Sequence, residues 1–402
     1  MILWQIFPLS FLLLVLFLLI SITQGANGSL ILGDFFVLNS FGLVLSVIPI
    51  FSLVSLIVLF NNNLSLLNSI LIVISGVSSV ICFNCNSVIL FFINYELSII
   101  LLLFSLFTGS PYSERNLAGW YFLGYLVFGG IPLLLCCIYT MINTNTFIGL
   151  SYSYSINHLL FLIFITKVPL FPFHSWLPIV HAEANSYVSI MLSGYIMKLG
   201  LLGIIRFFTL SGDSLKLYVF IFFVASCYFF ITCFLELDNK RWLAFLSLGH
   251  ISVGMVGLFS IPQSEDFLLG SFSLGHALSV IFLFLFFNMQ ASSTGSRNWI
   301  VLINNNNNSM ICLLVIGVLS LIAFPPSILF INELFIFVSN FNSQTVIVIF
   351  CLYIFLSVLG PICVLSLFLS RLNYTSNFNI DNIIIIILLC SMFIFNLYFI
   401  II

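Results

Sequence analysis

The 402-residue chain has the composition of a protein embedded in a membrane. Hydrophobic residues make up 62% of it, charged residues make up 5%, and the mean hydropathy is +1.30. A soluble surface needs about 25% or more charged residues, so a soluble globular fold is excluded. Nine basic and eleven acidic residues give a net charge of -2, which excludes a basic surface for nucleic acid and a polybasic tail for anionic lipid. We therefore expect the partners to be other membrane proteins and lipid.

Thirteen apolar stretches follow one another along the chain, each close to the ~20 residues that span a bilayer as a helix. The first stretch lacks a positively charged start and is expected to be a retained span rather than a signal peptide. Because only short loops separate the stretches, we predict an all-α polytopic membrane protein without a soluble domain for a nucleotide, flavin or iron–sulfur cluster. The predicted transmembrane helices cover residues 2–22, 36–60, 64–83, 87–107, 118–141, 157–181, 187–209, 216–235, 241–260, 266–289, 310–338, 344–370 and 382–402.

Two of these spans are long and contain internal prolines. Span 157–181 holds Pro169, Pro172 and Pro178, and span 310–338 holds Pro325 and Pro326. A proline removes a backbone donor and clashes with the preceding turn, so both spans should be broken helices. Each broken span is the fourth of five, in blocks 64–209 and 216–370, and this pairing predicts two inverted five-helix repeats. Residues 1–63 and 371–402 would add flanking transmembrane helices.

Loop charges indicate the orientation of the chain. Five basic residues follow even-numbered spans, namely Arg115, Lys240, Arg241, Arg297 and Arg371, whereas Arg206 and Lys216 fall on the other side. The positive-inside rule then places the first group and the N-terminus on the matrix or cytoplasmic side. We expect the cluster of Glu236, Asp238, Lys240 and Arg241 to be a solvated connection or a docking surface.

Four ionisable residues interrupt apolar stretches, namely Glu96, Lys167, Lys198 and Glu333. A charge at the bilayer centre costs roughly 2.5 to 3.5 kcal/mol, so each is a functional-site candidate. Moving one charge against ~180 mV requires about 4 kcal/mol, or about 3 pKa units, which is within the range that burial and pairing produce. A glutamate–lysine pair that forms and separates could therefore switch proton affinity. The alternative is that these residues are structural ion pairs that hold helices together.

Three histidines extend this set, namely His174, His250 and His276, because imidazole relays protons near neutral pH. Nearby Ser247, Ser252 and Ser279 could hold waters between them. The alternative is that each histidine is only a satisfied hydrogen-bonding group. A metal site is not expected, since His174, His181 and Glu183 lack ligand spacing on one helical face. The ten cysteines are interpreted as structural thiols.

Several motifs resemble the family of NADH-ubiquinone oxidoreductase chain 4. The resemblance covers roughly residues 87 to 340, and its most specific part lies between Lys167 and Glu183. The matching segments are SERNLAG at 113–119, IPLL at 131–134, KVPL at 167–170, HSWLP at 174–178, HAEA at 181–184, MKLG at 197–200, DNK at 238–240, HIS at 250–252, GHALS at 275–279, FPP at 324–326 and NEL at 332–334.

The resemblance implies a proton-pumping membrane-arm subunit of respiratory complex I in the mitochondrial inner membrane. It implies that Glu96 and Lys167 interact, that Lys198 is the central relay and Glu333 the terminal one, and that the three histidines lie along the hydrated axis. Neighbouring antiporter-like chains would be the partners. NADH, flavin, iron–sulfur clusters and ubiquinone would bind to other subunits. This chain itself would bind no cofactor. An AT-rich bias, seen in 48 phenylalanines and runs such as Asn304 to Asn308, favours an organellar gene.

The chain departs from the family pattern at three points. Asn185 stands where the family usually has proline, and Leu201 replaces a small residue. The Glu96 helix is the fourth predicted span where the family has it fifth, so one N-terminal helix is expected to be missing. Two rival functions stay open: a stand-alone cation/proton antiporter that uses the same residues, and a structural subunit whose buried charges only fix helix packing.

Overall fold

The structure is a computed structural model that describes residues 30–32, 35–60, 65–143, 147, 154–207, 214–260, 266–302, 308–325, 327–340 and 344–370. The predicted spans 2–22 and 382–402 lie outside these residues, as do Pro326 and Arg371. The described part is dominated by helices, and eight helical segments in it are long and apolar enough to cross a membrane. The predicted all-α membrane class is therefore confirmed.

A short hairpin precedes the first described helix and corrects the predicted start of span 36–60. Strands β1 (Leu30–Leu32) and β2 (Phe36–Leu38) pair antiparallel, and Phe36 also bridges to Cys85. Helix α2 (Ser40–Phe60) begins only after this hairpin. The sequence Gly33-Asp34 is typical of a turn, but the predicted start of the span was based on hydropathy alone.

The other predicted spans correspond to helices whose ends shift by a few residues. Span 187–209 is one helical run with three parts, of which the middle part is a π-helical turn: α8 (Ser186–Met191), η1 (Leu192–Ile196) and α9 (Met197–Phe207). A four-residue helix, α13 (Trp299–Leu302), was not expected. The continuous helices are α3 (Leu66–Asn84), α4 (Val88–Gly109), α5 (Arg115–Asn143), α10 (Ser214–Leu235), α11 (Asn239–Ser260), α12 (Asp266–Thr294) and α16 (Gln344–Ser370).

Both spans that were predicted to be broken are broken, whereas the single prolines Pro49, Pro132 and Pro361 lie inside the continuous helices α2, α5 and α16. The first consists of α6 (Tyr154–Lys167) and α7 (Trp176–Glu183), and the second of α14 (Asn308–Leu321) and α15 (Ile328–Ser339). At the first break the indole N–H of Trp176 donates to the Thr166 carbonyl at 3.3 Å. At the second, the Ser327 hydroxyl accepts from the Phe330 N–H at 3.4 Å and caps α15. Side chains thus satisfy backbone groups that the breaks release.

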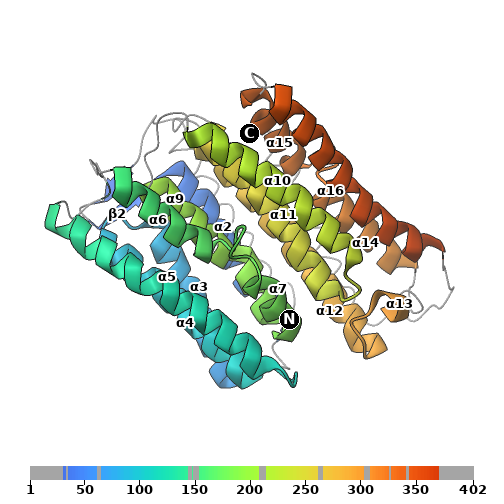
Figure 1. The fold of residues 1–402 in the computed structure, drawn as a ribbon. Coiled ribbons are helices and arrows are strands. Elements are labelled where there is room, and N and C mark those ends of the chain that lie inside the picture. The colour runs from blue at the N-terminus through green and yellow to red at the C-terminus, as the bar shows by residue number, and fades with distance from the viewer. Residues whose placement is uncertain are drawn as a thin grey trace.

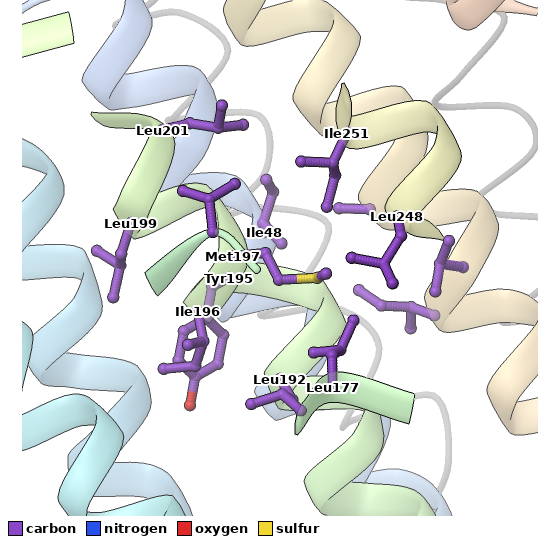
Figure 2. Close-up of a cluster of buried hydrophobic side chains, with 14 of the residues drawn as sticks. Ile48, Leu177, Leu192, Tyr195, Ile196, Met197, Leu199, Leu201, Leu248 and Ile251 are labelled. Atoms are coloured by element: carbon purple, nitrogen blue, oxygen red, sulfur yellow. The ribbon is translucent and has the colours of Figure 1, made fainter. Parts of the chain in front are cut away.

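One packing feature is shared by the two predicted five-helix blocks. The third helix of each block contacts both parts of the broken helix: α5 packs against α6 and α7, and α12 against α14 and α15. Figure 1 shows the two blocks side by side, with α3 to α9 in one group and α10 to α16 in the other, and α2 packs against both α3 and α12. Buried apolar side chains such as Ile48, Met197 and Leu248 fill the contact between α2, α9 and α11 (Figure 2). Lys198 therefore lies in the packed centre of the molecule.

Cations from the second block cap the C-terminal end of α7 in the first. Arg297 donates to the Ala182 carbonyl, and the Lys240 ammonium donates to the Ala184 carbonyl at 2.6 Å. Both cations also lie over the ring of Tyr112, at 4.0 Å for Arg297 and 5.2 Å for Lys240. Burial raises the pKa of Tyr112, which lies in the connection between α4 and α5, so its ring contacts the cations as a neutral phenol. A cation at a helix C-terminus stabilises the unpaired carbonyls.

The buried position of Lys240 corrects the prediction of a solvated connection. Its side chain is 6% exposed, whereas the adjacent Arg241 is exposed. Arg115 lies at the same end of the molecule and donates to the Ser110 carbonyl at 2.7 Å. Arg206 instead donates to the Phe83 carbonyl, near the C-terminal end of α3 and at the other end of the molecule. Among the described basic residues, Arg115, Lys240 and Arg297 therefore lie at one end of the molecule and Arg206 at the other.

Replacing Lys240 with methionine should destabilise the junction between the two blocks. The substitution keeps most of the apolar stem but leaves the Ala184 carbonyl without its charged donor, a loss of about 2 kcal/mol. We expect a lower midpoint for thermal dissociation of the purified protein or its complex. The matched control is Arg241→Met, which removes an exposed charge one residue away. Equal midpoints for the two variants would contradict the assigned cap.

Candidate functional site

Glu96 and Lys167 form a buried ion pair between α4 and the end of α6. The Lys167 ammonium lies 2.9 Å from Glu96 Oε1, and both residues are less than 10% exposed. The ammonium also donates to the Leu126 carbonyl of α5 at 3.1 Å. Removing one partner of such a pair costs about 3 to 5 kcal/mol, because the other charge stays buried. The pairing inferred from the family resemblance is thus present in the structure.

Two adjacent glycines of α5 make room for this pair. A Cβ atom at Gly129 would lie 2.7 Å from Lys167 Cε, and one at Gly130 would lie 3.0 Å from Glu96 Oε1. Glycine costs about 1 kcal/mol relative to alanine inside a helix, so two in succession signal a close approach. Sequence reasoning did not single them out, although the Gly-Gly pair in an apolar helix was the available signal.

Lys198 is fully buried and lies two residues after the π-helical turn. Its ammonium donates to the Ser193 carbonyl at 2.5 Å, five residues earlier, and lies 3.1 Å from Nδ1 of His276 on α12. A π-turn widens the backbone hydrogen-bond ring and is frequent at functional sites. Within the described part of the chain, no carboxylate forms an ion pair with Lys198. Its charge therefore depends on a carbonyl and an imidazole.

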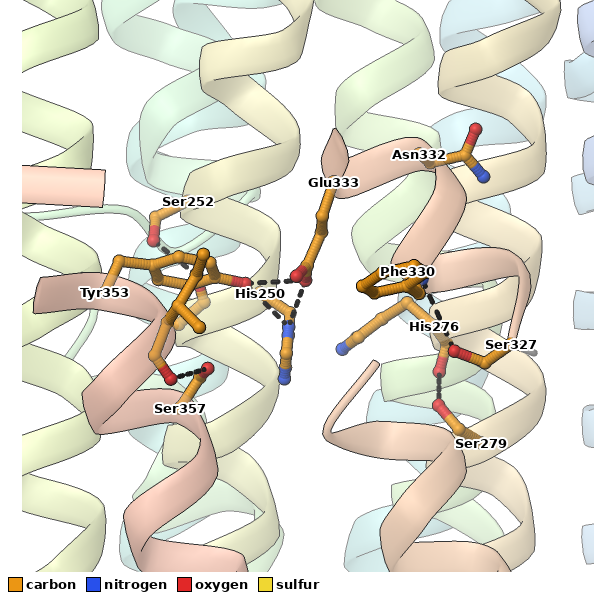
Figure 3. Close-up of polar contacts among 12 residues, drawn as sticks. His250, Ser252, His276, Ser279, Ser327, Phe330, Asn332, Glu333, Tyr353 and Ser357 are labelled. Atoms are coloured by element: carbon orange, nitrogen blue, oxygen red, sulfur yellow. Dashed lines mark hydrogen bonds and ion pairs between the residues drawn. The ribbon is translucent and has the colours of Figure 1, made fainter. Parts of the chain in front are cut away.

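A series of neighbouring buried side chains runs from Lys198 through His276 and His250 to Glu333. The rings of His276 and His250 are 5.8 Å apart, and Nδ1 of His250 lies 3.3 Å from Glu333 Oε1. Both histidines are 1% exposed and Glu333 is 8% exposed. The three residues come from α12, α11 and α15, and Figure 3 shows the side chains of His250 and Glu333 directed toward one another. The structure therefore joins four predicted residues, Lys198, His276, His250 and Glu333, in one series.

Tyr353 of α16 belongs to this series and was missed from the sequence. Its hydroxyl donates to Glu333 Oε1 at 2.6 Å and lies 3.3 Å from His250 Nδ1. The side chain is fully buried between the rings of Phe230 and Phe350. A tyrosine in an apolar helix reads as an ordinary packing residue, so the sequence offered no distinguishing signal.

His174 is not joined to the series. It is partly exposed, and its ring packs against Phe171, Tyr228 and Phe229, with centroid distances of 6.0, 5.8 and 4.9 Å. His181 is fully buried and stacks on Phe284 at 5.2 Å. The three serines considered as water ligands each donate to a carbonyl of their own helix: Ser247 to Ala244, Ser252 to Gly249 and Ser279 to His276.

The fold and the buried series define a polytopic membrane protein with ionisable groups connected through its interior. A family model described as the transmembrane region of NADH:quinone oxidoreductase/Mrp antiporter matches residues 85–360. The chain belongs to this family. The match includes Glu96, Lys167, Lys198, Glu333 and the other residues of the series.

Curated relatives carry the name NADH-ubiquinone oxidoreductase chain 4. The protein from Ceratitis capitata is 29% identical over 263 residues, which cover 62% of this chain and 58% of that protein. The one from Locusta migratoria is 32% identical over 231 residues, or 52% of this chain and 50% of that protein. The chain thus spans just over half the length of the curated relatives it matches.

Two solved respiratory complexes contain chains with the same fold. A chain of respiratory complex I from Thermus thermophilus with bound NADH superposes with a TM-score of 0.78 and 18% identity, covering 90% of this chain and 82% of that one. A chain of the archaeal membrane-bound sulfane sulfur reductase superposes with a TM-score of 0.80 and 15% identity, covering 96% and 86%. These similarities establish the membrane fold independently of the sequence motifs.

Replacing Gly129 with alanine should separate Lys167 from Glu96 while the helix persists. The new methyl group occupies the place of Lys167 Cε, and alanine itself favours helix by about 1 kcal/mol. A structure of the variant by electron cryomicroscopy should show the ammonium more than about 4 Å from the carboxylate, beyond ion-pair range. Gly124→Ala is the matched control on the same helix, since a Cβ there meets nothing within 4 Å. An intact pair in Gly129→Ala would show that the glycine does not control this contact.

Proposed function

We propose that this chain is a proton-translocating membrane-arm subunit of respiratory complex I in the mitochondrial inner membrane. It would couple NADH oxidation and ubiquinone reduction, carried out by other subunits, to proton transfer through its buried residues. The observation that carries the proposal is the contact series Lys198–His276–His250–Glu333, whose members come from four different helices. The names of the curated relatives and of the Thermus thermophilus complex support it.

The first step is electrostatic control of Lys198 by the Glu96–Lys167 pair. The two lysine-bearing segments touch, because a Cβ at Gly200 would lie 2.4 Å from Cγ2 of Val168, the residue after Lys167. When Lys167 leaves Glu96, its charge is no longer compensated and repels a proton on Lys198. Two like charges about 10 Å apart repel by about 1.7 kcal/mol at an effective dielectric constant of 20, which exceeds a tenfold change in proton affinity.

The second step moves the proton from Lys198 toward Glu333. The Lys198 ammonium gives its proton to Nδ1 of His276, and the imidazolium releases one from Nε2. Because the two rings are 5.8 Å apart, a water molecule or a ring movement carries the proton to His250. His250 takes the proton at one nitrogen and delivers another from Nδ1 toward Glu333. Glu333 then releases it toward the positive side of the membrane.

The redox cofactors are assigned to other subunits. NADH, flavin, iron–sulfur clusters and ubiquinone would bind there, and the contribution of this chain would be the movement of protons. The partners would be the neighbouring antiporter-like chains of the membrane arm and lipid. The N-terminus is proposed to face the matrix, on the side where Arg115, Lys240 and Arg297 gather.

A stand-alone cation/proton antiporter is the second candidate, because the matching family model includes Mrp antiporters. A native gel of mildly solubilised membranes, stained for NADH oxidation and probed for this chain, separates the two functions. Migration with a large NADH-oxidising band is expected for complex I. A small species without NADH oxidation, and proton flux that depends on sodium or potassium without NADH, would establish the antiporter instead.

Replacing Lys198 with methionine should abolish proton pumping by this chain in an assembled complex. The apolar side chain keeps the packing of a fully buried site but has no proton to give to His276. Proton uptake into sealed membranes, measured per NADH oxidised, should fall below that of the parent while the native gel shows the same band. The exposed Arg241→Met variant controls for loss of a basic residue. An unchanged proton yield in Lys198→Met would leave only the structural-subunit function.

A further inference from the structure

Tyr353 forms a triangle with the last two residues of the proposed path. Its hydroxyl oxygen lies 2.6 Å from Glu333 Oε1 and 3.3 Å from His250 Nδ1, and His250 Nδ1 lies 3.3 Å from the same carboxylate oxygen. The three residues belong to α16, α15 and α11, and Figure 3 shows them converging. The hydroxyl thus contacts both the proton donor and the proton acceptor of the final transfer.

The shortest contact in the triangle determines where the phenolic hydrogen lies. A phenol has one hydrogen, and at 2.6 Å that hydrogen is directed at the ionised carboxylate of Glu333. The phenolic oxygen then has lone pairs only for the N–H at Nδ1 of His250. His250 Nδ1 lies 3.3 Å from both the phenolic oxygen and Glu333 Oε1, and the second leg of the route through Tyr353 is the short 2.6 Å bond.

We propose that the proton passes from His250 to Glu333 through the hydroxyl of Tyr353, which makes Tyr353 a proton-relay residue of this chain. The inference rests on the proposed function. In the step, the N–H bond at Nδ1 of His250 breaks and an O–H bond forms at Tyr353. The original O–H bond of Tyr353 breaks in concert, and an O–H bond forms at Glu333 Oε1. The tyrosine ends neutral, the carboxylate becomes a carboxylic acid, and His250 loses one proton.

The step also leaves the hydroxyl reversed. Its new hydrogen points at the Nδ1 atom that has just lost a proton, and the new Glu333 O–H donates to the phenolic oxygen. A second proton cannot follow until Glu333 has released the first and the hydroxyl has turned back. With its hydrogen bonds reversed, the same path is aligned for return of the proton until Glu333 releases it toward the positive side of the membrane.

The groups that face Glu333 come from every helix packed around it. His250 of α11 and Tyr353 of α16 contact the carboxylate, and His276 of α12 lies behind His250. Asn332 on the same helix is turned to Ser271, whose hydroxyl lies 3.0 Å from its side-chain oxygen. Tyr353 is thus a neutral hydrogen-bond donor to the Glu333 carboxylate, which also contacts the imidazole of His250.

The test is Tyr353→Phe in the assembled complex, with Tyr195→Phe as the matched control. Tyr195 is also fully buried, and its hydroxyl bonds to Ser75 of α3 at 2.7 Å, with no titratable partner. Tyr353→Phe keeps the ring and should lower the rate of proton pumping by about tenfold, since a positioned proton-transfer group contributes at least that much. Tyr195→Phe should pump like the parent.

The pH profile distinguishes a relay from a packing role. Without the phenolic donor the ionised form of Glu333 loses a hydrogen bond, so the residual pumping of Tyr353→Phe should shift by about one unit toward higher pH. Tyr353→His, which again offers a donor and an acceptor, should recover part of the rate. A Tyr353→Phe complex that fails to assemble, while Tyr195→Phe assembles, would overturn the relay in favour of a packing role.

Glu333→Gln separates failure of this inference from failure of the proposed function. If Glu333→Gln stops pumping while Tyr353→Phe keeps the rate and pH profile of the parent, the relay through Tyr353 is wrong and the proposed path stands. If Glu333→Gln itself pumps like the parent, the proposed path fails and the relay fails with it. The expected result is reduced proton pumping in both variants, together with the shifted pH profile in Tyr353→Phe.

Discussion

The cost of burying charge in a medium without water is the constraint on which this structure depends. Each of the four ionisable residues in the apolar stretches has a partner that stabilises it. Glu96 and Lys167 pair with one another, Lys198 donates to a carbonyl and an imidazole, and Glu333 accepts from Tyr353. Because these partners come from different helices, the same contacts that reduce the cost of burial also determine how the helices are ordered.

Irregular backbone lies beside three of these charges. Lys167 is the last residue of α6, where the first broken span opens, and Lys198 follows the π-helical turn by two residues. Glu333 lies in α15, shortly after the second break. Interrupted helices release carbonyl groups that a regular helix would use internally, and they are tolerated in a membrane only where other groups satisfy them. The Ser193 carbonyl of the π-helical turn accepts from the Lys198 ammonium.

Polar contacts join the helices of residues 64–209 to those of residues 216–370 at two levels. In the centre, Lys198 of the first block contacts His276 of the second, and at one end Lys240 and Arg297 of the second block cap α7 of the first. The contact series therefore crosses the boundary between the blocks. A change in their relative position would alter the distance from Lys198 to His276 directly. This arrangement makes the boundary the place where packing and the proposed proton transfer would be coupled.

The sequence by itself determined the membrane class, the described spans, both broken helices and the four charged positions, because hydropathy, proline and charge act locally along the chain. It identified His250 and His276, but it also included His174, which the structure leaves outside the series. From the sequence, Lys240 was predicted to lie in a solvated connection or docking surface, and Tyr353 was not identified. Neither the burial of Lys240 nor the hydrogen-bond partners of Tyr353 can be inferred from the residues next to them in the chain. Only the tertiary structure decided these points: Tyr353 lies 103 residues from His250 in the chain. Contacts over such separations depend on how whole helices pack, and side-chain volumes across several helices determine that packing.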